Sequence, residues 1–251
     1  MPSFLNHPNQ KRVKLLLLGD PGAGKTGLMA TLANKDYKVR ILDLDNNLAI
    51  LNAYLQEGKG SNVSYYSIPA KDPDSWKKSI ALTTQWKLPE EDLGDLTTWD
   101  SNTVLVVDSA TFWNDTCMSQ VLKENGISDD KAGFDQSMWG VMNKRFENQV
   151  ARLTSDRYKF HLIFIAHIRL IENKKTGGIM RAFPSFLGQQ LPNIVARYMN
   201  NVWLATRNKD GKPSLTTQTT RDMGYLKCSA PHRVHAEAPF DLGAVFKQIE
   251  A

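Results

Sequence analysis

VKLLLLGDPGAGKTG, residues 13–27, says more about the fold than any other part of this chain. Its apolar run, residues 15–18, is long enough for one buried strand. Directly afterwards, residues 19–26 match the pattern G-x-x-x-x-G-K-S/T at every fixed position. The glycines let the backbone bend so that successive N–H groups point into one hollow, which suits phosphate oxygens. We therefore expect a nucleotide triphosphate site at this turn.

The segment after the turn is predicted to start a helix at Lys25, and the partial positive charge of its N-terminus would face the same anion. Lys25 is placed to reach the β- and γ-phosphates, and the hydroxyl of Thr26 is placed to ligate Mg²⁺. ATP and Mg²⁺ are therefore the expected cofactors. The residues expected to touch the nucleotide are Gly19, Asp20, Pro21, Gly22, Ala23, Gly24, Lys25, Thr26 and Gly27.

Length and composition favour one globular domain over residues 1–251, with residues 1–12 as a polar N-terminal arm. The net charge of +5 mildly favours a polyanionic partner. Cys117 and Cys228 have no metal-type spacing, which is typical of a reducing compartment. No apolar run approaches the roughly 18 residues that a membrane helix needs. We therefore expect a cytoplasmic protein with no membrane partner.

Three further apolar segments are predicted to be strands with polar residues at their ends. Residues 39–45 (VRILDLD) end in acids, and residues 103–107 (TVLVV) run directly into Asp108. Residues 160–166 (FHLIFIA) precede His167. Fully apolar runs of this kind are typical of parallel strands buried on both faces. Because the carboxyl ends of parallel strands meet at one edge of a sheet, these polar residues should gather beside the phosphate loop.

The remaining segments complete an α/β fold with a mostly parallel central sheet, flanking helices and a C-terminal antiparallel hairpin. Two candidate strands before Asp108 favour the branch of P-loop proteins that has an extra strand and a separate catalytic acid. We predict a strand at 62–68, helices at 74–86, 112–124, 136–153, 187–199 and 240–249, and a hairpin at 201–220 around the turn 208–213; residues 88–100, 125–135 and 169–185 are predicted to be loops.

Asp108 has the Walker B pattern, in which a carboxylate after an apolar strand binds Mg²⁺ through water. The alternative is that Asp108 caps the following helix. Asp45 is the best candidate for the carboxylate that polarises the attacking water, because catalysis of this kind depends on placement and charge stabilisation. The alternative is that Asp45 caps the segment 46–55, and Asp43 is the reserve choice for the catalytic acid.

His167 would emerge at the same edge of the sheet, where it is placed to hydrogen-bond the γ-phosphate and report its presence. The alternative is a purely structural histidine. Four cations on the glycine-containing segment that follows are candidates for binding a phosphate backbone, and the alternative is an ordinary solvated hairpin. These DNA-binding candidates are Arg169, Lys174, Lys175 and Arg181.

Several spaced segments together resemble the RecA core. They are ILDLDNNL (41–48), TVLVVDSATF (103–112), FDQSMWGVMNKRF (134–146) and LIFIAHIR (162–169). The first looks like the strand that carries the catalytic glutamate of that family, with Asp45 in its position. The second is similar to the Walker B strand, and the third resembles the stretch after the first DNA-binding loop. The fourth resembles the strand before the second DNA-binding loop, with His167 where RecA usually has glutamine.

By size and style the chain resembles the minimal RecA-core ATPases of bacteriophages, the Sak-type single-strand annealing and recombination proteins. The resemblance spans residues 13–227 and implies a DNA-dependent ATPase that binds single-stranded DNA and assists pairing or annealing. It also implies a homo-oligomer, as a filament or a ring, a phage-encoded protein in the host cytoplasm, and a single-strand binding protein as a candidate partner. The second DNA-binding loop of the family maps on residues 169–183. In such assemblies a neighbour supplies a cation to the nucleotide, and Arg221 and Lys227 are the candidates.

Two other functions stay open. One is a DNA-annealing module in which ATP is an assembly clip that is not hydrolysed. The other is a P-loop kinase acting on a small molecule or a polynucleotide end. That class generally has an arginine-rich lid after the sensor strand, and residues 169–181 match such a lid poorly.

Overall fold

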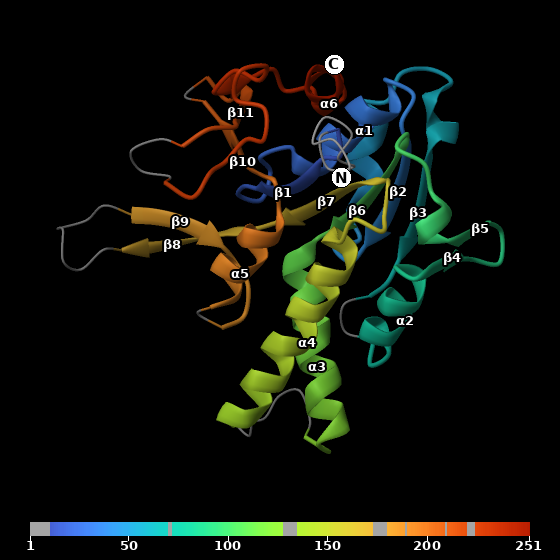
Figure 1. Cartoon of the computed structure of the whole chain (residues 1–251), viewed down its shortest axis with the longest axis vertical. Coiled ribbons are helices and arrows are strands. Elements are labelled where there is room, and N and C mark those ends of the chain that lie inside the picture. The colour runs from blue at the N-terminus through green and yellow to red at the C-terminus, as the bar shows by residue number, and fades with distance from the viewer. Residues whose placement is uncertain are drawn as a thin grey trace, which may run out of the picture.

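The computed structural model of this chain describes residues 11–69, 72–127, 135–172, 180–188, 190–208, 210–219 and 224–251, with the backbone alone at 170–172 and 180–182. An eight-stranded sheet organises these residues, in the order β12-β11-β10-β1-β7-β6-β2-β3 (Figure 1). Its strands are β1 Lys14–Leu18, β2 Lys38–Asp43, β3 Val63–Ser67, β6 Thr103–Asp108, β7 His161–Ala166, β10 Asn201–Arg207, β11 Pro213–Thr216 and β12 Glu237–Ala238.

The sheet is parallel from β10 to β3 and antiparallel where β11 and β12 join it. This confirms the expected α/β fold with a mostly parallel sheet and C-terminal antiparallel strands. Strand β7 lies between β1 and β6, so the strand with the phosphate loop and the strand ending in Asp108 are not neighbours.

Helices cover both faces of the sheet (Figure 1). One face is packed by α1 Lys25–Ala33 and α6 Leu242–Glu250, and the other by α2 Ser75–Leu82, α3 Ala110–Glu124, α4 Gln136–Thr154 and α5 Leu191–Tyr198. Alternate residues of each strand serve the two faces, as the pleat requires. In β1, for example, Leu15 and Leu17 belong to one core cluster, whereas Leu16 and Leu18 belong to the other.

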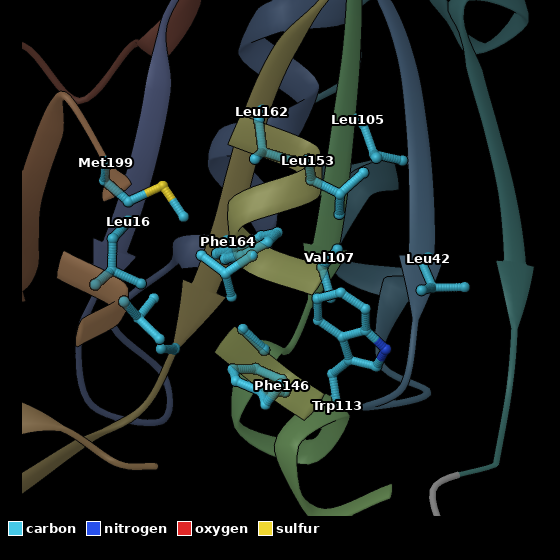
Figure 2. Close-up of a cluster of buried hydrophobic side chains, with 14 of the residues drawn as sticks. Leu16, Leu42, Leu105, Val107, Trp113, Phe146, Leu153, Leu162, Phe164 and Met199 are labelled. Atoms are coloured by element: carbon cyan, nitrogen blue, oxygen red, sulfur yellow. The ribbon is translucent and has the colours of Figure 1, made fainter. Parts of the chain in front are cut away.

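The core on the α3–α4 side is rich in aromatic rings (Figure 2). The indole of Trp113 lies 5.3 Å from the ring of Phe146 and 5.6 Å from that of Phe164, both in edge-on geometry. Each large apolar side chain buried in this way stabilises the fold by roughly 1.5–3 kcal/mol. The central strands are therefore rigid supports for the residues at their carboxyl ends.

The region 88–100, expected to be a loop, is partly ordered. It contains strand β5 Asp92–Asp95, which pairs with β4 Gln85–Lys87, and a short 3₁₀ helix Leu96–Thr98. Trp86 on β4 is fully buried, and its Nε1 donates a hydrogen bond to Glu91 Oε2 at 2.9 Å. One buried tryptophan thus holds a hairpin that the acidic, turn-rich composition did not suggest. The helix predicted at 74–86 ends at Leu82, because residues 85–87 form strand β4 of this hairpin instead.

For the region 169–185, the sequence left a loop or an ordinary solvated hairpin open, and its described residues form a hairpin. Strands β8 Ile168–Glu172 and β9 Met180–Pro184 form an antiparallel hairpin that projects from the body of the molecule (Figure 1). Helix α5 begins only at Leu191, with Pro192 in its first turn, where the missing N–H of proline is tolerated. Two further 3₁₀ helices, Leu48–Ala53 and Lys59–Asn62, connect β2 with β3. Among the described helices, none combines the length and the apolar character that crossing a membrane requires.

Candidate functional site

A cavity of about 310 Å³ opens at the carboxyl edge of the central strands. It is lined by Pro21, Gly22, Gly24, Lys25, Thr26, Gly27, Asp45, Asn47, Ile50, Tyr54, Asp108, His167 and Arg207. The structure therefore brings together the phosphate loop and the acids and histidine that the sequence placed at the ends of three separate strands.

The phosphate loop has the backbone geometry that its glycines permit. Gly22 and Gly24 have φ angles of 78° and 89°, in the left-handed region that other residues rarely adopt. At Gly24 an added Cβ would also lie 2.9 Å from the ring of Phe240. Gly24 is the N-cap residue of α1, so the N-terminus of this helix opens at the cavity, where its dipole favours an anion.

Lys25 lies over the loop and is only 6% exposed. Its Nζ donates hydrogen bonds to the carbonyl oxygens of Gly19 and Asp20, both at 2.8 Å. Burial lowers the pKa of Lys25 below its ordinary value, and the nearby carboxylate of Asp108 opposes that shift. Phosphate oxygens entering the cavity would be stronger acceptors for this ammonium group than the two carbonyls.

Thr26 and Asp108 meet at the base of the cavity. The Thr26 hydroxyl donates to Asp108 Oδ2 at 2.8 Å, while Asp108 Oδ1 is buried without a hydrogen-bond partner among the described residues. Burial raises the pKa of Asp108 to about 7, and the carboxylate of Asp45 adds to the rise. A hydroxyl and a carboxylate with an unpartnered oxygen are hard donors of the kind that Mg²⁺ prefers, so these residues fit that ion.

The alternative role for Asp108, as a helix cap, is not observed. Ser109 is the N-cap residue of α3, and its hydroxyl accepts a hydrogen bond from the N–H of Phe112 at 3.4 Å. Asp45 is not a cap either, because Asn47 holds that position in the next 3₁₀ helix. Both acids therefore keep their side chains at the cavity.

Asp45 connects two strand ends across the cavity. Its Oδ1 accepts a hydrogen bond from the N–H of Ser109 at 3.1 Å, and its Oδ2 lies 3.4 Å from Nε2 of His167. The reserve candidate, Asp43, is almost fully buried and accepts hydrogen bonds from the Asn46 N–H and the Ser67 hydroxyl. Asp43 does not line the cavity, so the geometry favours Asp45 as the acid that faces a bound nucleotide.

His167 follows the last residue of β7 and is held on both sides. Its N–H donates to the Thr111 hydroxyl at 3.1 Å, and its ring packs edge-on against Phe112 with centroids 5.9 Å apart. Its carbonyl accepts a hydrogen bond from the N–H of Ser185 at 2.8 Å, directly after the hairpin β8–β9. Nδ1 is buried and has no hydrogen-bond partner within the described part of the chain. The histidine thus contacts both the candidate catalytic acid and the hairpin.

The candidate DNA-binding cations are placed only in part. Arg169 lies on β8 opposite Phe183 of β9, and the backbone of Arg181 belongs to β9. Lys174 and Lys175 lie outside the described residues, as does Arg221. Lys227, the other residue considered for action on a neighbour, pairs through its backbone with Val202 and is not at the cavity. Burial lowers the pKa of Lys227.

Several residues of the cavity were not predicted from the sequence. Arg207 ends strand β10 and donates from Nε to the carbonyl of Gly22 at 2.8 Å. The sequence did contain a signal for Arg207, since it is a cationic residue directly after a predicted strand. Tyr54 packs on Gly27, where an added Cβ would lie 2.7 Å from its ring. No local sequence pattern predicts that Tyr54, Ile50 and Asn47 line the cavity, because their position depends on how a 3₁₀ helix folds back on α1.

The family model described as "AAA domain" matches residues 11–223. A search of curated proteins found no match. The matched range begins before β1 and extends past β11, so it includes every residue that lines the cavity.

Proposed function

This chain belongs to the AAA domain family, and from that premise we propose that it is an ATPase of RecA type that binds single-stranded DNA and acts in recombination or annealing. The Sak-type bacteriophage proteins are the proposed model for its role. The observation that supports the proposal best is the convergence of Lys25, the pair Thr26–Asp108 and the pair Asp45–His167 on one cavity.

Each group at the cavity has a distinct proposed task. The loop amides and Lys25 bind the phosphates, and Thr26 and Asp108 hold Mg²⁺, which when bound neutralises phosphate charge. Asp45 orients the attacking water and accepts its proton. Ile50 and Tyr54, 40% and 37% exposed, offer an apolar wall for the base of the nucleotide.

The proposed DNA surface is the hairpin β8–β9 together with Lys174 and Lys175, which lie between its two strands in the sequence. The hydrogen bond between the His167 carbonyl and the Ser185 N–H joins the cavity to the end of this hairpin. Phe183 stacks on Tyr225 at 5.6 Å and an interplanar angle of 22°, so β9 is also braced against the segment beside β10. A change at His167 therefore has a short physical route to the base of the hairpin, where Arg169 lies.

We also propose that the protein acts as a homo-oligomer of single-domain subunits, with Arg221 or Lys227 offered to the nucleotide of a neighbour. A single-strand binding protein is the proposed accessory partner. The net charge of +5 and a cavity that opens at the carboxyl edge of the sheet support both suggestions.

The decisive experiment is ATP hydrolysis measured across a titration of single-stranded DNA, with Lys25→Ala as the control. Turnover that rises with DNA in the wild type and is absent in the variant is the expected result. ATP bound but retained uncleaved would replace the proposal with the assembly clip. Transfer of phosphate to a small molecule or a polynucleotide end would replace it with the kinase. ATP affinity retained by Lys25→Ala would overturn the site itself.

The DNA surface has a separate test. Replacing Lys174, Lys175 and Arg181 together by alanine should weaken binding to single-stranded DNA and flatten its salt dependence by about 0.7 log units for each phosphate that the variant no longer neutralises. The matched control replaces Lys59, Lys78 and Lys87, which pair with acids on another part of the surface. An unchanged salt slope in the hairpin variant would move the DNA surface elsewhere.

A further inference from the structure

The phosphate loop lies directly against strand β10. β1 and β10 pair in parallel, with Leu18 opposite Leu204, so the chain leaves both strands at the same edge of the sheet. The approach is close: a Cβ added to Gly19 would lie 2.5 Å from the carbonyl oxygen of Ala205. Arg207, two residues further along β10, therefore reaches the peptide between Gly22 and Ala23, which we call the crest of the loop.

Arg207 is bonded at two points. Its Nε donates to the Gly22 carbonyl at 2.8 Å, and its Nη1 donates to the Gly211 carbonyl at 2.7 Å. Gly211 belongs to the turn between β10 and β11, which is closed by a hydrogen bond from the Asn208 N–H to the Lys212 carbonyl at 2.8 Å. The guanidinium thus links Gly22 of the phosphate loop to Gly211, between β10 and β11.

Side-chain packing does not fix Gly22. It has a left-handed φ of 78°, and apart from Gly22 itself and its two chain neighbours, no atom of the described residues lies within 4 Å of the place where its Cβ would be. The peptide between Gly22 and Ala23 is instead fixed through its polar atoms, because Arg207 binds its oxygen and the Asp20 carbonyl accepts from its N–H at 3.1 Å. A loop fixed before binding loses less conformational freedom when phosphate arrives.

We propose that Arg207 is a positioning residue of the nucleotide site, which holds the crest of the phosphate loop through the Gly22 carbonyl and anchors it to the β10–β11 turn. This inference rests on the proposed function, since it assumes that the cavity binds ATP. Arg207 would thus be a residue of the nucleotide site that comes from β10, a strand outside the phosphate-loop motif. The hydrogen bonds of Arg207 go to the backbone carbonyls of Gly22 and Gly211, whereas Asp45 contacts His167, so we expect Arg207 to affect binding rather than the chemical step.

The test compares the ATP affinity and turnover of wild type, Arg207→Gln and Arg207→Lys. A hydrogen bond from a charged group is typically worth about a tenfold change in affinity or more, and we take the lower figure because this bond is exposed. Arg207→Gln should therefore raise the Kd and KM for ATP about tenfold while kcat at saturation stays within about twofold. Arg207→Lys, which keeps the charge but can reach only one carbonyl, should recover part of the loss. Melting of the nucleotide-free protein should be unchanged.

The matched control is Arg233→Gln, because Arg233 also donates from its guanidinium to a backbone carbonyl, that of Ile249 at 3.0 Å, but at another place. It should bind ATP as the wild type does. Wild-type affinity in Arg207→Gln, or an equal loss in Arg233→Gln, would overturn the inference and leave the proposed function standing if Lys25→Ala still abolishes binding. A large fall in kcat without a change in KM would also overturn it. If the wild type binds no nucleotide, the proposed function fails and the inference fails with it.

Discussion

Strand β7 carries a histidine at its start and another just past its end, and the two have opposite surroundings. His161 is 1% exposed, accepts a hydrogen bond at Nδ1 from the Val13 N–H at 3.0 Å, and has Nε2 3.0 Å from Glu250 Oε1. The rings of Tyr37 and Phe246 pack on it. His167 has a 22% exposed side chain, lines the cavity, and contacts Asp45 at 3.4 Å.

The contrast extends to the two edges of the sheet. Near His161, opposite charges meet, because the ammonium group of Lys247 lies 3.4 Å from the carboxylate of Glu250. On the same edge, the buried guanidinium of Arg12 donates to the carbonyls of Leu153, Ser155 and Phe160. At the cavity, the carboxylate of Asp45 disfavours the ionised form of Asp108 and raises its pKa. One edge is built for stability, and the other keeps a charge arrangement that a bound cation and phosphate would complete.

The largest expected effect is that of replacing Asp108, which lies at the cavity edge of the sheet. Asp108→Asn should lower ATP hydrolysis by at least about 10²-fold, because it removes charge at the metal position. It should also raise the free energy of unfolding of the nucleotide-free protein by ~1–3 kcal/mol at pH 8, since a buried carboxylate beside another acid is removed. Turnover and urea unfolding measure the two effects.

The matched control for this variant is Asp115→Asn. Burial raises the pKa of Asp115 to about 6, but Asp115 lies on α3 outside the cavity. The control should gain stability and keep normal turnover. A loss of stability in Asp108→Asn would show that the acid is a structural group, and the contrast between the edges would fail.

An intermediate effect is expected from exchanging each histidine for asparagine. His161→Asn should lower the free energy of unfolding by about 2 kcal/mol, because a buried hydrogen bond and ring packing are removed, while the Kd for ATP stays normal. His167→Asn should change stability by less than about 1 kcal/mol and lower turnover about tenfold or more. Chemical denaturation and steady-state kinetics on both variants check this. The reverse pattern would mean that the two ends of β7 have been assigned the wrong way round.

The smallest expected effect concerns Glu250 and pH. Burial opposes ionisation of this carboxyl, but hydrogen bonding to His161 and Tyr37 outweighs burial and holds the pKa of Glu250 below its ordinary value of 4.5. Because the folded-state pKa is the lower one, the stabilisation is present above about pH 4.5 and is lost as the pH falls through the folded-state value.

Glu250→Gln should therefore lower the free energy of unfolding by about 1 kcal/mol at pH 7, after allowance for solvent screening, and the difference from wild type should disappear on acidification. Urea unfolding between pH 7 and 3.5 measures it. The exposed Glu57, changed to glutamine, is the control and should show no such difference at either pH. A deficit that persists in acid would mean that packing, not charge, accounts for the loss.

Much of the site followed from local sequence. The phosphate loop, the apolar runs before Asp108 and His167, and the parallel sheet were all predictable, because turn chemistry and side-chain periodicity are properties of adjacent residues. Parallel pairing then places the strand ends at one edge, which is why Lys25, Asp108 and His167 were expected to meet before any distance was known. The tasks assigned to these residues, and the DNA surface, stay predictions.

Other features depend on contacts between residues far apart in the chain. The pairing of Asp45 with His167, the reach of Arg207 to Gly22 and the packing of Tyr54 on Gly27 each require a particular order of strands or the return of one helix onto another. The β4–β5 hairpin likewise depends on the burial of Trp86. Sequence spacing specifies a turn or a strand because the interacting atoms are neighbours along the chain, whereas these contacts form only after the sheet and helices have packed.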